Sequence, residues 1–194
     1  MNTAEIIVHR GNSPVNTADP FDQVSYYAEQ GFQKIEVDIY AISETTFKFC
    51  HPVDADRIAS THTLHDGFLE KLVAKFPNIM WFVDLKCLDL DNIPMELLQF
   101  LVGTFKDTDV FTAAQHEILE LAHSANHPTA QYFKDNTEST LNYTPEFFIL
   151  DDRQDKTLQQ SKTLVFCPDS TTALTYIADG FAGAIVDGDK LIKG

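Results

Sequence analysis

The sequence predicts an α/β protein in which eight parallel strands close into a compact (β/α)8 TIM barrel. Segments with the pattern of strands alternate with segments with the pattern of helices along most of the 194 residues, and this alternation is typical of a parallel sheet. Charged residues also fall repeatedly at the ends of the strands, where barrel enzymes place their sites. An open doubly wound sheet is the alternative fold, but no glycine-rich phosphate loop follows the first strand to support its nucleotide-binding form.

The strand predictions rest on apolar periodicity. In residues 34–40 apolar and polar side chains alternate with a period of two, which indicates a strand with one polar face. Residues 79–86 are nearly all apolar, as expected of a strand covered on both faces, and residues 47–51 form an additional short strand after a turn. The eight barrel strands are predicted at 6–8, 34–40, 79–86, 110–113, 129–133, 147–150, 164–167 and 183–186.

The helix predictions rest on a period near 3.6 residues and on residues that stop helices. In the first helix Phe21, Val24 and Tyr27 recur at helical spacing before Gly31, and Ser170 is positioned to cap the last one. We predict one barrel domain over residues 1–194, with helices at 20–31, 63–76, 94–102, 115–123 and 171–179 and an irregular polar stretch at 134–146.

The composition narrows the class of partner. The chain has 14 Lys and Arg against 29 Asp and Glu, a formal net charge of −15. Such a field repels nucleic acid and anionic membranes, but it is compatible with a small phosphate-bearing ligand in a locally positive or metal-loaded pocket. The three cysteines follow no metal spacing, and no signal peptide or membrane-spanning apolar stretch is evident. We therefore expect a cytoplasmic protein with reduced thiols and a small-molecule partner.

Three acidic residues point to a metal site. Glu36 and Asp38 lie two residues apart on one strand, so they share a face about 6–7 Å apart. On that stretch alone they are more simply read as the solvated face of an edge strand. In a closed barrel they instead face inward with Asp84, and uncompensated interior carboxylates cost several kcal/mol. Lys86 supplies only one charge, so the pattern predicts a hard divalent cation with oxygen ligands.

Histidines and further acids occur near the same strand ends. His9 ends the first strand, and His51 ends the extra strand at 47–51. Asp187 ends the last strand, where it is either a site residue or a turn residue. The pair His62 and His65 near Asp66 is compatible with a second metal site, although surface histidines explain it better. His116, His123 and His127 are expected to face solvent.

These motifs together resemble the glycerophosphodiester phosphodiesterase family, which shares a barrel with the phosphatidylinositol phospholipases C. The resemblance starts with Ile-Val-His-Arg-Gly at 7–11 and Asn16-Thr17, and continues with Ile-Glu-Val-Asp at 35–38 and Phe49-Cys50-His51. Segments 82–86 and 180–187 are similar to the third strand and the closing motif of the family. The match thus covers both ends of the barrel and is more specific in the first half.

The resemblance implies a phosphoric diester hydrolase that acts on a small phosphodiester. It implies that Glu36, Asp38 and Asp84 bind one divalent cation, Mg²⁺ or Ca²⁺, that His9 and His51 are the acid–base pair, and that Arg10 and Lys86 hold phosphate oxygens. Arg10 and Lys86 are alternatively counter-ions for the acids. The alternative function is a barrel that binds a phosphate metabolite or a protein partner without catalysis.

The sequence also departs from the family pattern. Val15 stands where the family usually has Glu, and Asp84 is shorter than the usual Glu. The connection after His51 is short, so we expect a more open site. Ala113-Ala114-Gln115 replaces the Ser-Phe expected near the fourth strand. No apolar loop or basic patch is evident in the sequence, which favours a soluble substrate over a bilayer lipid.

Overall fold

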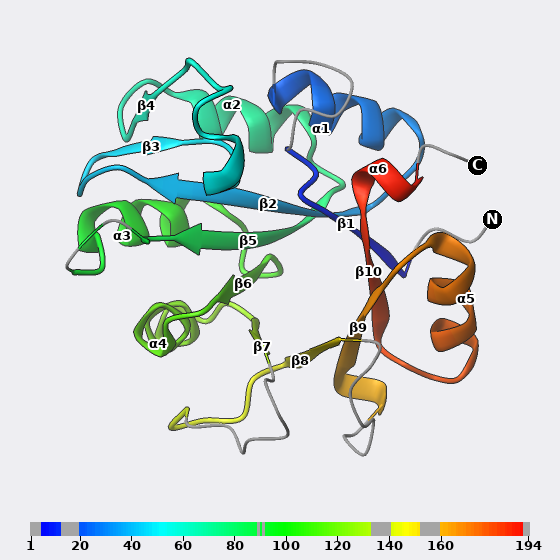
Figure 1. The fold of residues 1–194 in the computed structure, drawn as a ribbon. Coiled ribbons are helices and arrows are strands. Elements are labelled where there is room, and N and C mark those ends of the chain that lie inside the picture. Colours follow the sequence, from blue (N-terminus) through cyan, green and yellow to red (C-terminus); the bar gives the residue numbers. More distant parts are fainter. Residues whose placement is uncertain are drawn as a thin grey trace.

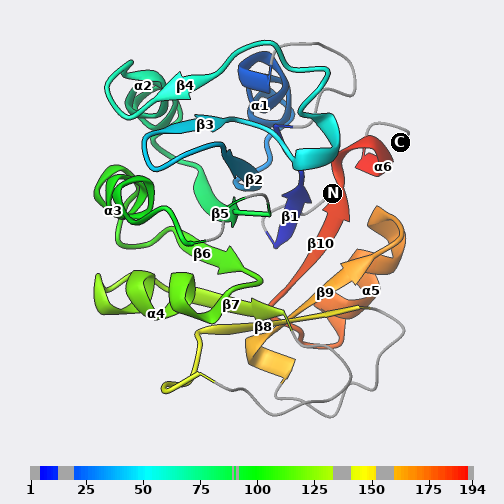
Figure 2. The same ribbon diagram turned by 60° about the vertical axis from the view of Figure 1, so that its left-hand side comes forward.

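The computed structural model describes residues 5–12, 20–88, 90, 92–132, 141–151 and 160–191. Within them, eight parallel strands form a closed ring in which each strand pairs with the next and β1 pairs with both β10 and β2 (Figures 1 and 2). This closure confirms the (β/α)8 barrel and excludes the open sheet. The ring strands are β1 (Ile6–His9), β2 (Lys34–Ala41), β5 (Met80–Lys86), β6 (Val110–Ala113), β7 (Thr129–Tyr132), β8 (Phe147–Asp151), β9 (Thr163–Cys167) and β10 (Gly183–Asp187).

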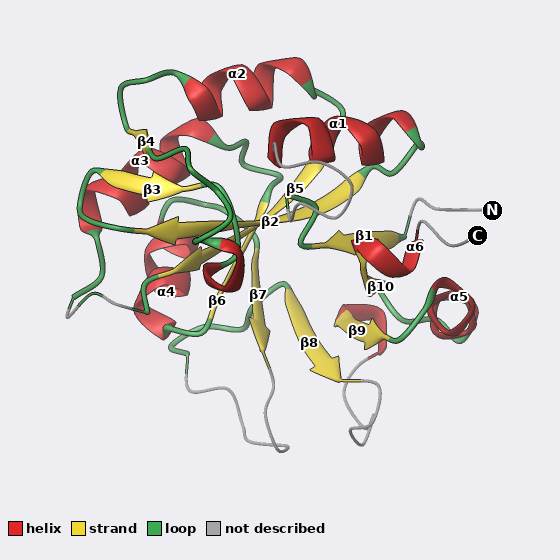
Figure 3. Ribbon diagram, turned by 45° about the horizontal axis from the view of Figure 1, so that its top comes forward, coloured by secondary structure: helices red, strands yellow, loops and turns green. Residues whose placement is uncertain are grey.

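Helices surround the ring of strands (Figure 3). They are α1 (Pro20–Glu29), α2 (Phe68–Lys75), α3 (Met95–Thr104), α4 (His116–Ser124), α5 (Ser170–Ala178) and the short α6 (Gly188–Leu191). No helix in the described part of the chain is both long and apolar enough to cross a membrane.

A small antiparallel extension lies beside the ring. β3 (Thr46–Lys48) pairs with β2, and β4 (His62–Thr63) pairs with β3. Two 3-10 turns, η1 (Pro52–Asp54) and η2 (Gln160–Lys162), complete the described elements. The strand predicted at 47–51 therefore ends at Lys48, and the chain bends through His51 into η1.

Each of the five predicted helices differs from its predicted bounds at one end or both, and the differences at α2, α3 and α5 have local causes. α2 begins at Phe68 because the backbone of Gly67 before it is in the left-handed conformation (φ 71°). The preceding residues His62–Thr63 form β4 and cannot belong to the helix. α3 continues through Gly103. α5 is capped by Asp169, whose carboxylate accepts a hydrogen bond from the Thr172 N–H at 2.8 Å, rather than by Ser170.

The core has two parts, separated by the wall of the barrel. The larger lies between the strands and the helices and contains buried side chains such as Trp81, Leu72 and Leu98. The smaller fills the barrel interior and is formed by Ile7, Phe82, Val110, Ala130, Ile149, Leu164 and Ile185. Since alternate residues of a strand share a face, His9 points to the same side as Ile7, and Asp84 to the same side as Phe82. The apolar interior thus supports polar side chains at the carboxyl ends of the strands.

Candidate metal centre and active site

Three buried carboxylates meet at the carboxyl end of the barrel. Glu36 and Asp38 are alternate residues of β2, and Asp84 of β5 lies opposite Asp38 in the strand register. Glu36 is 4 % exposed, and Asp38 and Asp84 are fully buried. One carboxylate oxygen from each lies within 4.8 Å of the others, a geometry that can hold a metal ion. The structure thus brings together the three acids that the sequence singled out.

Several oxygens of these carboxylates accept no hydrogen bond from the described residues and can therefore coordinate a cation. Glu36 Oε2 accepts the Arg10 backbone N–H at 2.6 Å, and Asp84 Oδ2 accepts from Lys86 Nζ at 2.6 Å and from the Tyr132 hydroxyl at 3.2 Å. Glu36 Oε1, Asp84 Oδ1 and both Asp38 oxygens are buried and accept no hydrogen bond from any residue that the structure describes. Unpaired oxygens of this kind are the ligands that Mg²⁺ and Ca²⁺ prefer, so the residues fit such an ion.

The charge balance of the cluster supports the same conclusion. Lys86 Nζ is 3.6 Å from Asp38 Oδ1, so one ammonium serves three acids. Burial and the neighbouring Asp84 raise the pKa of Asp38 to about 7. Burial, Asp38 and Asp84 raise the pKa of Glu36 well above its ordinary value. Burial disfavours the charged form of Lys86, but Asp84 and Asp38 outweigh it and raise its pKa. A cation would take the place of the protons that this cluster otherwise retains.

The loop after β1 is clamped onto β2 beside the acids. The Gly11 N–H donates to the Glu36 carbonyl at 2.8 Å. The Asn12 amide donates to the Asp38 carbonyl at 2.7 Å and accepts the Asp38 N–H at 3.1 Å. Arg10 has a left-handed backbone (φ 51°), which is costly for a residue with a side chain. This backbone directs the Arg10 N–H at the Glu36 carboxylate. Asn12 carried no sequence signal beyond that of a turn residue.

His9 is held by a carboxylate from the last strand. Its Nδ1 lies 2.6 Å from Asp187 Oδ1, across the β1–β10 register in which the two residues are partners. The ring also packs edge-on against Phe166, with centroids 4.9 Å apart. The hydrogen bond from His9 lowers the pKa of Asp187. A carboxylate only accepts, so Nδ1 carries the proton and Nε2 is the nitrogen left for chemistry. Asp187, for which the sequence leaves a site role and a turn role open, thus contacts His9 at the end of β10.

His51 lies in a positively charged setting. Its Nε2 is 3.3 Å from Arg10 Nη2, and its Nδ1 is 3.2 Å from the Val53 N–H. A neutral imidazole has one acceptor nitrogen, so these two donors compete for one lone pair. Burial, followed by the charges of Arg10 and Lys86, lowers the pKa of His51 to about 4. His51 is therefore neutral at pH 7.

The predicted residues thus gather at one end of the barrel. Lys86 forms ion pairs with Asp84 and Asp38 in this structure. Tyr132 of β7 also contacts the site through Asp84, and no sequence motif indicates this role. His62 Nδ1 lies 3.1 Å from Asp66 Oδ2, and the His62 ring stacks on the ring of Phe68. The described residues show no second metal cluster there. Asn16, Thr17 and Val15 lie outside the described residues.

One expectation about the other histidines was wrong. His127 is only 3 % exposed rather than solvent-facing, and its Nε2 lies 2.9 Å from the Val102 carbonyl. The chain after α4 turns inward at this point, so the polar residue is buried with a backbone partner.

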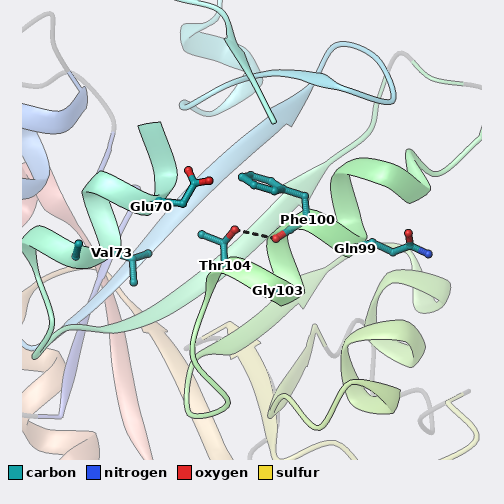
Figure 4. A pocket seen from close by; sticks show the side chains of 7 residues that line it. Glu70, Val73, Gln99, Phe100, Gly103 and Thr104 are labelled. Atoms are coloured by element: carbon teal, nitrogen blue, oxygen red, sulfur yellow. Dashed lines mark hydrogen bonds between the residues drawn. The ribbon is translucent and has the colours of Figure 1, made fainter. Parts of the chain in front are cut away.

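A groove on the outside of the barrel contains none of these residues. It has a volume of about 520 Å³ and lies between α2 and α3 (Figure 4). Its lining is mostly apolar or uncharged, and the Thr104 hydroxyl in it is spent on the Phe100 carbonyl at 2.9 Å. Glu70 is the only charged residue among those that line the groove, so the lining lacks the acid–base pair and the cluster of metal ligands that hydrolysis of a phosphodiester requires.

Comparison with known proteins supports the fold. The sequence matches no protein-family profile and no curated protein. A structure from Silicibacter pomeroyi DSS-3, described as a candidate glycerophosphoryl diester phosphodiesterase, superposes with a TM-score of 0.64 at 12 % identity, over 95 % of this chain and 90 % of that one. The phosphoribosyl anthranilate isomerase of Thermus thermophilus superposes with a TM-score of 0.55 at 9 % identity, over 95 % and 88 %. At such identities the likeness concerns the fold alone.

Proposed function

We propose that this chain is a metal-dependent phosphodiester hydrolase of the glycerophosphodiester phosphodiesterase type. The observation that supports it is a buried carboxylate triad with unpaired oxygens, flanked at one barrel mouth by two histidines, an arginine and a lysine. One divalent cation on Glu36, Asp38 and Asp84 would neutralise charge on the phosphate oxygens. The resemblance of the sequence motifs points to the same class.

The proposal gives the two histidines different roles. His51 is neutral in its cationic setting, so it acts as the base that takes the proton of the attacking hydroxyl. That hydroxyl belongs to the substrate where one neighbours the phosphate, and otherwise to water. Asp187 holds the imidazole of His9 through Nδ1, and His9 donates a proton to the leaving oxygen as the P–O bond breaks.

Turnover assays test the proposal. The purified protein is incubated with glycerophosphodiesters and with bis-p-nitrophenyl phosphate, in Mg²⁺, Mn²⁺ or Ca²⁺ and in chelator. We expect metal-dependent turnover that falls by about 10² to 10⁴-fold in His9→Ala and in His51→Ala. His65→Ala, which alters an exposed histidine, is the matched control. Circular dichroism checks that each variant folds.

The assay also separates the two functions. No turnover with any metal, together with phosphate or metal binding that Asp38→Asn abolishes, would favour a non-catalytic phosphate-binding barrel. Turnover that persists in His9→Ala would overturn the assigned acid–base pair.

A further inference from the structure

The two oxygens of the Asp84 carboxylate have different surroundings. Oδ2 accepts hydrogen bonds from Lys86 Nζ at 2.6 Å and from the Tyr132 hydroxyl at 3.2 Å. Oδ1 is buried and accepts no hydrogen bond from any residue that the structure describes. Because partners of this kind orient a carboxylate toward a metal, Oδ2 is taken by the protein and Oδ1 is the oxygen left for a cation.

Tyr132 is held in place on the inner side of the ring. Its strand β7 is separated by β6 from β5, which carries Asp84 (Figure 2). Tyr132 packs against the interior core, to which Ala130 of the same strand belongs. Its ring stacks on the ring of Phe166, with centroids 6.2 Å apart and planes 16° apart. Since a carboxylate only accepts, the fixed Tyr132 hydroxyl is the donor to Asp84.

Glu36 is constrained in the same way. Its Oε2 accepts the Arg10 backbone N–H at 2.6 Å, and its Oε1 is buried and has no hydrogen-bond partner among the described residues. Both Asp38 oxygens are unpaired, but Oδ1 lies 3.6 Å from the Lys86 ammonium. A cation therefore meets single oxygens of Glu36 and Asp84, and it can use both oxygens of either residue only if these hydrogen bonds break.

The number of available oxygens discriminates between the two hard cations. Ca²⁺ takes about six to eight oxygen ligands and often both oxygens of a carboxylate, whereas Mg²⁺ keeps several waters and needs few carboxylate oxygens. We propose that Tyr132 is a positioning residue that leaves only Oδ1 of Asp84 available, and that the site thereby selects Mg²⁺ over Ca²⁺. This inference rests on the metal centre of the proposed function and names its cation.

The test measures cation binding without a substrate. Mg²⁺ and Ca²⁺ are each titrated by calorimetry into the metal-free wild type, Tyr132→Phe and Tyr143→Phe. We expect the wild type to bind Mg²⁺ more tightly than Ca²⁺. Tyr132→Phe should lose at least about tenfold in Mg²⁺ affinity and change less than about threefold in Ca²⁺ affinity, because a released Asp84 can turn both oxygens to the larger ion.

Tyr143→Phe is the matched control. The Tyr143 hydroxyl contacts the Leu119 carbonyl at 3.0 Å and the Thr129 hydroxyl at 2.8 Å, at the other end of β7. Its removal should leave both affinities unchanged. A wild type that prefers Ca²⁺, or an equal loss for the two ions in Tyr132→Phe, would overturn the inference, because a merely structural role does not distinguish the ions.

A tyrosine spectrum gives a second readout that does not depend on the variant folding. Mg²⁺ on Asp84 weakens its acceptance of the Tyr132 hydrogen bond, so titration should change the near-ultraviolet absorption of the wild type. The change should persist in Tyr143→Phe and disappear in Tyr132→Phe, and an unchanged wild-type spectrum on Mg²⁺ binding would contradict the contact.

The same measurements separate this inference from the proposed function. Selective Mg²⁺ binding that depends on Tyr132, without turnover of any phosphodiester, would sustain the positioning role and refute the hydrolase. Metal-dependent turnover together with unchanged cation affinities in Tyr132→Phe would refute the positioning role and sustain the hydrolase.

Discussion

Asp38 illustrates how burial and a neighbouring acid govern a carboxyl group at the scale of one residue. Its pKa is about 7 in the folded chain against 3.8 ordinarily. Between pH 3.8 and about 7, the Asp38 carboxyl has lost its proton in the unfolded chain but still holds it in the folded chain. The stabilising contribution of Asp38 is therefore complete below pH 4 and is lost as the pH rises to 7.

The first prediction concerns the stability of the metal-free protein. Asp38→Asn removes this titration, so its free energy of unfolding relative to the wild type should rise between pH 4 and pH 7, by up to about 4 kcal/mol. Urea unfolding in chelator at several pH values measures the difference. The lowered pKa of His51 acts in the opposite direction and largely cancels in the comparison. Parallel stability curves for the two proteins would contradict the raised pKa.

Asp187 offers a second prediction at the residue scale. Asp187→Asn keeps the shape of the side chain but removes the charged acceptor that holds His9 through Nδ1. We expect kcat on a glycerophosphodiester to fall by about 10²-fold with little change in thermal stability. Asp189→Asn changes a partly exposed neighbour that pairs with Lys190, and it should leave kcat unchanged. An equal loss in both variants would indicate a general effect of charge.

At the scale of elements, the loop after β1 depends on a close approach to β2. A Cβ added at Gly11 would lie 2.2 Å from Ile35 Cγ2 and 3.1 Å from the Glu36 carbonyl oxygen. Gly103 in α3 has nothing within 4 Å of the same position. The glycine of the His-Arg-Gly pattern is thus required by packing, because the loop must reach the backbone that carries the acids.

The third prediction contrasts these two glycines. Gly11→Ala should destabilise the protein by about 1–3 kcal/mol or more and weaken metal binding, because the loop must shift away from Glu36. Gly103→Ala should stabilise α3 by about 0.5–1 kcal/mol. Urea unfolding and metal titration check both variants. A neutral Gly11→Ala would show that the loop is not clamped as described.

The elements were predictable wherever one local rule decided them. A period of two and a fully apolar run locate β2 and β5, and helical spacing locates α1. The predicted start of α2 was wrong because His62–Thr63 pair with β3 as strand β4. This pairing is a tertiary contact that no local sequence pattern contains. Local signals thus identify the units of the barrel better than they identify the boundaries of those units.

At the scale of the whole molecule, ring closure decides which parts of the site the sequence reveals. Glu36, Asp38 and Asp84 were predictable because each lies on the inward face of a strand that local patterns locate. Tyr132 and Asp187 come from β7 and β10, and their contacts with Asp84 and His9 depend on the curvature and closure of the ring. A linear sequence gives the register of neighbouring strands poorly and the distance across a barrel not at all.

The position of Asp187 on β10 has a consequence for protein synthesis. The carboxylate triad is complete once the ribosome has made the first 86 residues, whereas the partner of His9 is on the last strand of the ring. β10 must insert between β9 and β1 before His9 gains that carboxylate. A nascent chain therefore contains its cation ligands and both histidines long before the carboxylate that pairs with His9, so the proposed hydrolase reaches its full rate only after β10 has joined the ring.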